Sequence, residues 1–399
     1  MERIKADDLY AYWFLSEVAV APDGAHAAFV SRRARDDGKG YYACIHLLDT
    51  ATGAVRPLTG NGDEASFRWL DATTLIFPSC RTGDQPGKTA FYRLDIRGGE
   101  AERAFTIPLS VKQFHPLPDG RWFILTRRPM TSPEDLPADQ PQPGRDYTVF
   151  DELPFWADGL GMINGTRMSG WIFDPADGSV NQITPPTYDM EGAAVSPEGS
   201  RILYWGVSFE GIRPDYRQLM LYDLATGQTR SLVPDGKYRI TQVGWWGTDI
   251  WFEGGDPHTS VSRSPKLYLL NPATGDCRTF CAPDGFLGTS AIGDMSLGGG
   301  KVCAVQGDSL YAVRLQRDVT ALLRFDKAGN FAPVASYEGI ACFDIIGENA
   351  YLAAFRDHRP QELYRQPLSG GEPERLTQFH DAFLETRQIS RPEHITFRS

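Results

Sequence analysis

The sequence lacks the long apolar runs, the basic stretches and the paired cysteines that mark several classes of protein. No uninterrupted apolar stretch approaches the roughly 18 residues that a membrane-spanning helix needs. The N-terminal residues also lack the apolar core of a secretory signal. The balance of 40 Lys and Arg against 51 Asp and Glu is acidic, which argues against binding to a nucleic-acid backbone. We therefore expect a cytoplasmic protein that binds neither membrane nor nucleic acid.

Cysteine and histidine show no spacing that is typical of metal or redox sites. The six cysteines contain no C-x-x-C pair, and we expect them to be buried thiols. Cys277 and Cys281 would lie roughly 13 Å apart in a strand that rises ~3.3 Å per residue, which is too far for a disulfide. The seven histidines form neither H-E-x-x-H nor H-x-H. We predict no metal site and no cofactor.

The sequence also has no G-x-S-x-G elbow, the strained turn that presents the nucleophile of an α/β-hydrolase. The nearest approximations surround Ser208, Ser290 and Ser309, where no helix is predicted to follow the serine. A P-loop and a G-x-G-x-x-G motif are absent as well. We therefore predict that no catalytic residue lies in these 399 residues.

Turn residues, in contrast, are abundant and periodic. Gly and Pro make up 68 of the 399 residues, about 17% where roughly 12% is usual. In seven places an alternating apolar run enters a short turn that is closed by glycine. The glycine supplies the positive φ of a hairpin. Six of these turns open with Asp or Asn, whose side chain can accept a hydrogen bond from the backbone N–H two residues on. One interval between turn glycines is 79 residues, and the others are 42 to 54. The turn glycines are Gly53, Gly99, Gly178, Gly227, Gly275, Gly329 and Gly371.

A second series of seven hairpins precedes the first, so each period holds four strands. Four strands repeated seven times predict an all-β fold, a seven-bladed β-propeller of four-stranded blades. We expect a short helical segment in residues 1–16, the propeller in residues 17–380 and a linker in residues 381–399. The last blade contains all four of its strands in sequence. We therefore expect side-chain packing alone to join it to the first blade.

The long interval predicts an insertion at about residues 127–161 of the third blade, which its many prolines should make a projecting loop. In it Asp151 and Glu152 lie close to Phe155 and Trp156. Carboxylates near aromatic rings can hold a cationic group such as a peptide amine. In the alternative interpretation, the two aromatic residues pin the loop to the propeller and the acids face solvent.

Several segments can be compared with a known family: the start ADDLYAYWFLSEVAVAPDGAHAAFV, the repeated TATG hairpins, the segment DELPFWADGLG and the end ERLTQFHDAFLETRQISRPEHITFRS. Together they resemble the N-terminal propeller of prolyl-oligopeptidase-family serine peptidases, in the acylaminoacyl-peptidase-like branch. The resemblance implies an α/β-hydrolase domain with Ser, Asp and His, which these residues do not include, and a propeller that admits only short peptides. In dipeptidyl-peptidase relatives, propeller acids hold the substrate amine. By its location, the insertion would then offer Asp151, Glu152 and Trp156 as substrate-binding residues.

The sequence thus predicts the non-catalytic gating and substrate-selecting propeller of a serine oligopeptidase or acylaminoacyl peptidase. Its expected partners are a hydrolase domain, from the same gene or a separate chain, and a short peptide. Apolar surface that faces the hydrolase would promote self-association, so a homo-oligomer is left open. Two alternatives remain: a free-standing propeller that binds proteins or ligands, and a propeller enzyme with a central metal, as in lactonases.

Overall fold

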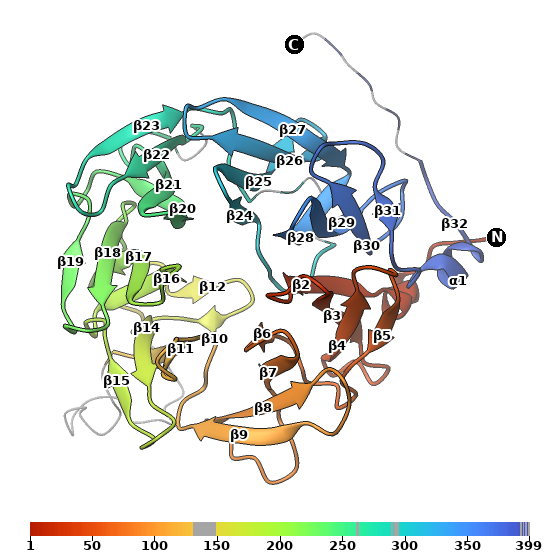
Figure 1. Cartoon of the computed structure of the whole chain (residues 1–399), viewed down its shortest axis with the longest axis horizontal. Helices are drawn as coiled ribbons and strands as arrows, with labels where there is room; N and C mark the ends of the chain where they lie inside the picture. The colour runs from red at the N-terminus through yellow and green to blue at the C-terminus, as the bar shows by residue number, and fades with distance from the viewer. Residues whose placement is uncertain are drawn as a thin grey trace. The chain divides into compact units, whose positions relative to one another are not determined.

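The computed structural model describes residues 1–130, 149–260, 263–288, 290, 295–391, 393, 395 and 397. Among them, seven sheets of four strands follow one another along the chain (Figure 1). In every sheet the strands pair in the order in which they occur in the sequence. The predicted seven-bladed β-propeller of four-stranded blades is confirmed. None of the described helices is long and apolar enough to cross a membrane.

The blades have the following strands, in chain order. Blade 1 contains β2 (Phe14–Val20), β3 (His26–Ala34), β4 (Tyr41–Asp49) and β5 (Val55–Pro57); blade 2 contains β6 (Arg68–Trp69), β7 (Thr74–Pro78), β8 (Thr89–Asp95) and β9 (Glu102–Ile107). Blade 3 contains β10 (Gln113–Pro116), β11 (Trp122–Pro129), β14 (Thr166–Phe173) and β15 (Val180–Gln182); blade 4 contains β16 (Tyr188–Val195), β17 (Arg201–Ser208), β18 (Gln218–Asp223) and β19 (Thr229–Ser231). Blade 5 contains β20 (Arg239–Trp246), β21 (Asp249–Gly255), β22 (Lys266–Leu270) and β23 (Cys277–Cys281). Blade 6 contains β24 (Cys303–Gln306), β25 (Ser309–Gln316), β26 (Val319–Asp326) and β27 (Phe331–Tyr337); blade 7 contains β28 (Gly339–Ile346), β29 (Asn349–Phe355), β30 (Glu362–Pro367) and β31 (Glu374–Arg375).

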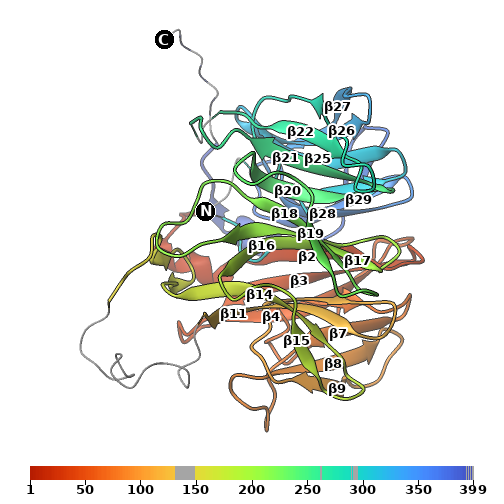
Figure 2. The ribbon, with the colours of Figure 1, turned by 90° about the vertical axis from the view of Figure 1, so that its left-hand side faces the viewer.

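The chain divides into two compact units. Unit 1 comprises residues 1–83, 90–104 and 285–399 and contains blades 6, 7 and 1 and most of blade 2. Unit 2 comprises residues 84–89 and 105–284 and contains blades 3, 4 and 5. Within unit 2, β14 of blade 3 lies beside β16 of blade 4 (Figure 2). Buried apolar side chains fill the space between neighbouring blades of each unit.

The periodic turns form as predicted. All seven turn glycines have positive φ, from 68° to 104°, a region that side-chain-bearing residues avoid. The residue that opens each of six turns accepts a bond from the N–H two residues on, as Asp49 does from Ala51 at 3.0 Å and Asn271 from Ala273 at 2.8 Å. The same bond occurs at Asp95, Asp174, Asp223 and Asp326.

A β-bulge interrupts the first strand of several blades. In β16, Met190 pairs with Gly206 and Gly192 pairs with Trp205, so that Glu191 is the extra residue. Register shifts at corresponding places interrupt β2, β20 and β28. A bulge re-aims the side chains around it, and in β16 the extra residue carries a charge.

The first and last blades meet within unit 1. Blade 7 is complete, since β28, β29, β30 and β31 pair in sequence. Leu15 and Leu363 belong to one buried apolar core that both blades share. Packing is nevertheless not the only link, because the N–H of Leu15 donates to Oε1 of Gln361 at 2.8 Å and that of Val20 donates to Oδ2 of Asp344 at 3.0 Å. The expectation that side-chain packing alone joins the two blades is therefore wrong.

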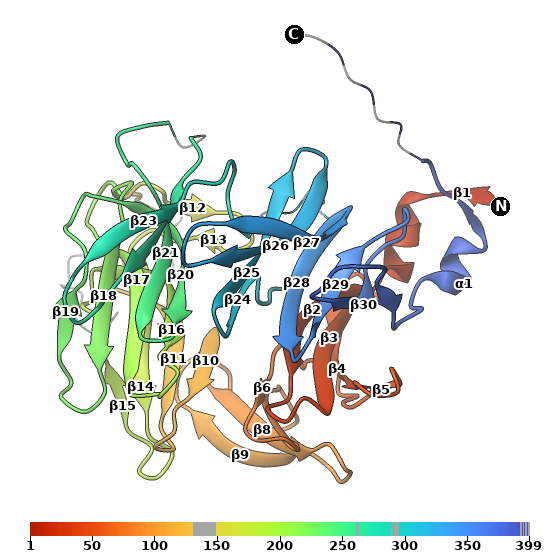
Figure 3. The same cartoon turned by 45° about the horizontal axis from the view of Figure 1, so that its top comes forward.

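Two segments, one near each end of the chain, pair within unit 1. β1 (Glu2–Arg3) pairs in parallel with β32 (Arg387–Gln388), next to α1 (Asp381–Leu384) (Figure 3). The predicted N-terminal helix is present but short, as the 3-10 helix η1 (Ala6–Ala11). Asp8 of η1 accepts two hydrogen bonds from Arg387, at 2.8 and 2.9 Å. These bonds are the main reason why the pKa of Asp8 is lowered to about 2.

The six cysteines are free thiols, but not all of them are buried. Cys281 and Cys342 are buried, whereas Cys80 and Cys277 are exposed. The expectation of buried thiols throughout is therefore wrong. Cys277 stands at the exposed start of β23, the edge strand of blade 5, and Cys80 lies in the connection between β7 and β8.

We expect Gly206→Ala to destabilise unit 2. A Cβ atom at this position would lie 2.9 Å from the Cα atom of Met190, and closer still to the carbonyl oxygen of Asp189. Backbone atoms cannot rotate away, so the free energy of unfolding should fall by about 1–3 kcal/mol, as measured by chemical denaturation. Gly60→Ala is the control, because nothing lies within 4 Å of its added Cβ atom. Equal stability of the two variants would contradict the packing described for β16 and β17.

Candidate functional site

One buried ion pair holds the described part of the third-blade insertion, residues 149–165. The side chains of Glu152 and Arg167 are only 4% and 1% exposed. Oε1 of Glu152 accepts from Nη2 of Arg167 at 2.6 Å, and Oε2 accepts from Nη1 at 3.0 Å. Oε2 also accepts from the N–H of Gly165 at 2.8 Å. The loop is thereby fastened to β14 by a bidentate, charge-assisted contact.

Every N–H group of the Arg167 guanidinium has an acceptor. Besides its two bonds to Glu152, it donates through Nε to Thr187 O at 3.1 Å, through Nη1 to Thr166 O at 2.8 Å and through Nη2 to Phe209 O at 2.7 Å. The guanidinium also lies 3.7 Å from the centroid of the Phe209 ring. A buried pair is stable only when its remaining donors are satisfied, and this condition is met.

The surroundings keep Glu152 ionised. Burial raises the pKa of its carboxyl group, but the hydrogen bonds from Arg167 and Gly165, together with the charge of Arg167, lower the pKa further, so that it ends below its usual value. Both oxygens of the carboxylate already accept bonds within the protein. A substrate amine would therefore have to displace Arg167 in order to reach Glu152.

The three residues predicted to bind substrate thus lie in different settings. Asp151 is exposed and accepts a bond from Nδ2 of Asn164 at 3.0 Å. Trp156 is 51% exposed, whereas Glu152 is buried. In the alternative interpretation both acids face solvent, which holds for Asp151 and is wrong for Glu152. That Phe155 and Trp156 pin the loop stays a prediction, since the two side chains are 38% and 51% exposed. Substrate binding by Asp151 and Trp156 stays a prediction, and the prolines between residues 131 and 148 lie outside the described residues.

The insertion also pairs with a loop of blade 4. The N–H of Leu153 donates to Gly211 O at 2.9 Å, and the N–H of Arg213 donates to Leu153 O at 2.9 Å. Beyond this contact, β12 (Trp156–Ala157) and β13 (Gly161–Met162) form a short hairpin. Large apolar side chains are exposed along both segments, and we call them the apolar surface: Val149, Phe150, Leu153, Phe155, Trp156, Leu160, Met162 and Ile212. A concentration of such residues marks an interaction site.

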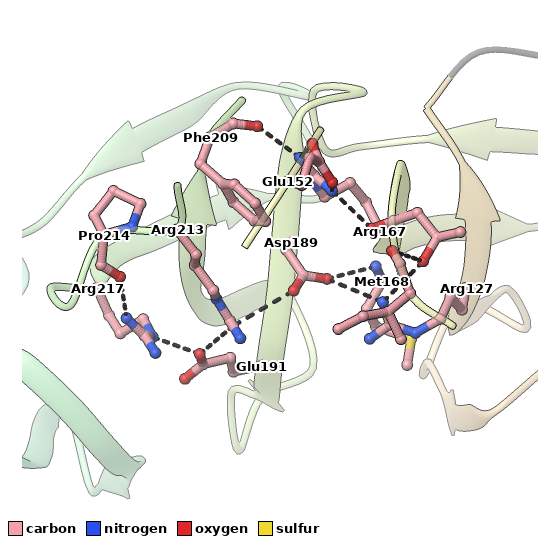
Figure 4. Close-up of polar contacts among 12 residues, drawn as sticks. Arg127, Glu152, Arg167, Met168, Asp189, Glu191, Phe209, Arg213, Pro214 and Arg217 are labelled. Carbon is pink, nitrogen blue, oxygen red and sulfur yellow. Dashed lines mark hydrogen bonds and ion pairs between the residues drawn. The ribbon is translucent and has the colours of Figure 1, made fainter. Parts of the chain in front are cut away.

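Figure 4 shows a row of alternating charges. One of its members, Arg213, directly follows Ile212 of the apolar surface. Asp189 stands between two arginines, with Oδ1 3.8 Å from Nη1 of Arg127 and Oδ2 3.4 Å from Nη2 of Arg213. Oε1 of Glu191 in turn pairs with both Arg213 and Arg217. We call these five residues the arginine row. It begins and ends with a cation.

Main-chain groups fix the members of the arginine row. Oδ1 of Asp189 accepts from the N–H of Met168 in β14 at 2.7 Å. Arg217 donates through Nη1 to Pro214 O at 2.9 Å and to Tyr216 O at 2.8 Å. These bonds hold an acid of β16 and an arginine of the β17–β18 connection in place, so the row is organised before any ligand arrives.

No sequence motif marks the arginine row. Its members come from β11, β16 and the β17–β18 connection, and only the blade-to-blade packing brings them together. One signal was present: Asp189 and Glu191 stand two apart in a first strand that is otherwise apolar or small. Such a pair would lie on one face of a regular strand, where charges need partners.

The structure also places the other residues that were considered as metal ligands or nucleophiles. In the described part of the chain, no three His, Cys, Asp or Glu side chains are grouped closely enough to hold a metal ion. Ser208 ends β17 and Ser309 begins β25, so both belong to blade strands. Ser290 lies between β23 and β24.

Comparison with known proteins places the fold. No family model matches the chain. It is 25% identical to the uncharacterized peptidase YuxL of Bacillus subtilis, over 99% of this chain and 61% of that protein. Its structure matches the acylaminoacyl peptidase of Pyrococcus horikoshii with a TM-score of 0.72 and 17% identity, over 98% of this chain and 56% of that one. The chain has the fold of an acylaminoacyl-peptidase propeller. The resemblance expected from its sequence segments is confirmed at this level.

Two further structures fit this acylaminoacyl-peptidase-like propeller. A puromycin-hydrolyzing peptidase of Mycobacterium tuberculosis matches with a TM-score of 0.63 and 15% identity, over 95% of this chain and 56% of that one. The isolated propeller domain of the Trilobed protease of Pyrococcus furiosus matches with a TM-score of 0.58 and 14% identity, over 93% of this chain and 99% of that one. The chain thus spans between half and two thirds of YuxL and of the full-length peptidases, but nearly all of an isolated propeller.

We expect Glu152→Ala to release the 149–165 segment, because the buried Arg167 would lose its counter-charge. Removing one partner of a buried pair costs about 3–5 kcal/mol, so the free energy of unfolding should fall by up to that amount. Limited proteolysis should also cut this segment faster. Asp151→Ala is the matched control, since this neighbouring carboxylate is exposed and its loss should change stability by only about 0.5 kcal/mol. Indistinguishable variants would refute the anchoring role.

The low pKa of Glu152 sets the direction of its pH dependence. A carboxyl group whose pKa is lower in the folded protein stabilises the fold above its unfolded pKa and loses that contribution as the pH falls through the folded value. The stability difference between wild type and Glu152→Ala should therefore be constant near neutral pH and shrink below about pH 4, near the usual pKa of a glutamate. Unfolding curves recorded from pH 7 to pH 3 test this, and a difference that grows on acidification would contradict it.

Proposed function

We propose that this chain is the non-catalytic, substrate-selecting propeller of a serine oligopeptidase that resembles acylaminoacyl peptidases. In this proposal an α/β-hydrolase domain outside these 399 residues cleaves the peptide bond, and the propeller limits access to short peptides. The proposal includes the cytoplasmic location that the composition leads us to expect. Asp151 and Trp156 remain the predicted substrate contacts, whereas Glu152 holds the segment that presents them.

The coverage of the structural match carries this proposal. Nearly the whole chain, 98%, superimposes on 56% of the Pyrococcus horikoshii acylaminoacyl peptidase, so the remaining 44% of that enzyme has no counterpart in these residues. The sequence contains no G-x-S-x-G elbow, which is what a propeller without its hydrolase would show. The similar structures also include a puromycin hydrolase and prolyl endopeptidases. Hydrolysis of small peptide-like substrates is the activity that these relatives support.

The apolar surface gives the proposal a second support. Trp156, Met162 and Ile212 are 51%, 58% and 73% exposed, and a group of exposed large apolar side chains is typical of an interaction site. A hydrolase domain or a peptide would cover such side chains. Their exposure is also the feature that should make the chain self-associate when it is isolated.

Self-association can be tested by making the apolar surface polar. We expect the isolated chain to associate as its concentration rises, and the double variant Trp156→Ser, Ile212→Ser to weaken that association at least several-fold in sedimentation velocity. Leu70→Ser is the control, because Leu70 is exposed to 40% but lies outside the apolar surface. A wild-type chain that stays monomeric at high concentration would argue against an uncovered interface.

A fluorophosphonate probe, which labels activated serines, tests whether the catalytic serine lies outside the propeller. We expect no labelled serine in the chain of 399 residues. In extracts of the source cells, a probe-reactive serine hydrolase should copurify with this propeller, on the same polypeptide or as a separate chain. Labelling within residues 1–399 would overturn the proposal. A propeller that purifies without any reactive hydrolase would do so too, and would favour a free-standing binding module.

A further inference from the structure

The arginine row carries more positive than negative charge. Among the described residues, its three guanidinium groups, of Arg127, Arg213 and Arg217, form ion pairs with two carboxylates, those of Asp189 and Glu191. Asp215 also attracts Arg217, but its own ion pair is with Arg239. Arg167 does not alter this balance, because Glu152 pairs with it alone. In a chain whose formal net charge is -11, a fixed local excess of cationic groups is unexpected. An excess of this kind is what an anionic ligand would complete.

The arginines also offer more N–H donors than the protein accepts. Among the described residues, the Nε atoms of Arg127 and Arg213 are buried and have no acceptor. The remaining contacts of Arg127 are a bond from Nη1 to Oγ1 of Thr166 at 3.3 Å and the long approach to Asp189. Leaving a buried donor without an acceptor destabilises the protein. A small rotation of either guanidinium toward an incoming acceptor would recover part of that cost.

The guanidinium groups are partly shielded but accessible. The side chains of Arg127, Arg213 and Arg217 are 20%, 22% and 14% exposed. A cation in this setting binds a carboxylate more strongly than one on an open surface, where water and salt screen the charge. Asp189 and Glu191 keep the arginines in place, so a ligand would not have to order three long side chains on binding.

The row adjoins an apolar surface, which narrows the class of ligand. Ile212 directly precedes Arg213 and is 73% exposed, and Leu153, which bridges to Ile212, is 54% exposed. A suitable ligand therefore combines a small anion with an apolar group a few ångströms away. The C-terminal residue of a peptide has this form, with a planar carboxylate that fits a guanidinium fork and a side chain beside it.

We propose that the arginine row binds the free α-carboxylate of short peptides, while the C-terminal side chain lies on Leu153 and Ile212. This inference rests on the proposed function, since it names how the propeller selects its peptides. Asp189 and Glu191 act as positioning residues in it. Peptides that end in a free carboxylate and an apolar side chain would be preferred over amidated peptides and over the interiors of long chains.

The test compares two peptides that differ only in charge at the C-terminus. Calorimetry or NMR titration of the whole chain with N-acetyl-Gly-Gly-Leu and with its C-terminal amide should show at least tenfold tighter binding of the free acid. The difference should shrink as NaCl is raised from about 0.05 to 0.5 M, because the contact is between charges. Equal binding of acid and amide, or no binding of either, would overturn the inference.

Variants then locate the contact. Arg213→Gln should reduce the preference for the acid to less than about twofold, and Arg213→Lys should retain part of it, because lysine keeps the charge but loses the fork. Arg97→Gln removes the same charge from an arginine that is 74% exposed and pairs with Asp95; it should keep the full preference. Arg127→Gln is the second variant at the row, should Arg213→Gln fail to fold. A preference that survives both Gln variants would contradict the assignment.

The outcomes separate this inference from the proposed function. If a fluorophosphonate-reactive hydrolase accompanies the propeller but acid and amide bind equally, the proposed function stands and the carboxylate site falls. If the acid is preferred but no hydrolase accompanies the chain, the proposed function falls. A last experiment adds inorganic phosphate or acetate, each at millimolar concentration, to the complex of the chain with the free acid. If phosphate displaces the peptide at the same concentration as acetate does, the arginine row is a general anion site. That result would overturn the assignment to peptide carboxylates.

Discussion

The buried pair between Glu152 and Arg167 is the contact on which the candidate site depends. It fastens an inserted segment to β14 of blade 3, and through Phe209 and Thr187 the same guanidinium contacts blade 4. A loop of this length pays a large conformational cost if it is to present side chains in one arrangement. Here a single arginine with all five N–H groups satisfied removes that freedom. The apolar surface and the backbone contact of Leu153 with the β17–β18 connection both follow from this anchor.

The neighbouring arginine row also consists of arginines and carboxylates, but their ion pairs are arranged differently from the Glu152–Arg167 pair. In the anchor, one cation meets one anion in the protein interior, and the pair is complete. In the row, three cations share two anions at partial exposure, and the arrangement is incomplete. Burial and stoichiometry, rather than residue identity, therefore distinguish a structural ion pair from a candidate binding site. The two lie within one pair of blades, so an ordered surface and an available charge occur side by side.

Much of the fold could be predicted from the sequence, because its determinants are local. The turn glycines and the Asp or Asn residues that open the turns act within four residues of one another, so their period reports the blades directly. The candidate site was predicted only in part. Asp151 and Glu152 are adjacent, yet one faces solvent and the other is buried, since the choice depends on Arg167, which lies beyond the hairpin. Likewise Arg127, Asp189 and Arg213 carry no common motif, because strand pairing and blade packing, not spacing, bring them together.

By itself, the sequence determined the number of blades, the four strands of each and the completeness of the last blade, since hydrophobic alternation and turn chemistry are short-range properties of the chain. The tertiary structure alone decided which carboxylate is used as an anchor, which aromatic side chains stay exposed, and how Asp8 and Arg387 join a segment near the N-terminus to one near residue 387. Those outcomes depend on contacts between residues far apart in sequence. Their energies arise from desolvation and charge pairing, which exist only once the blades have packed.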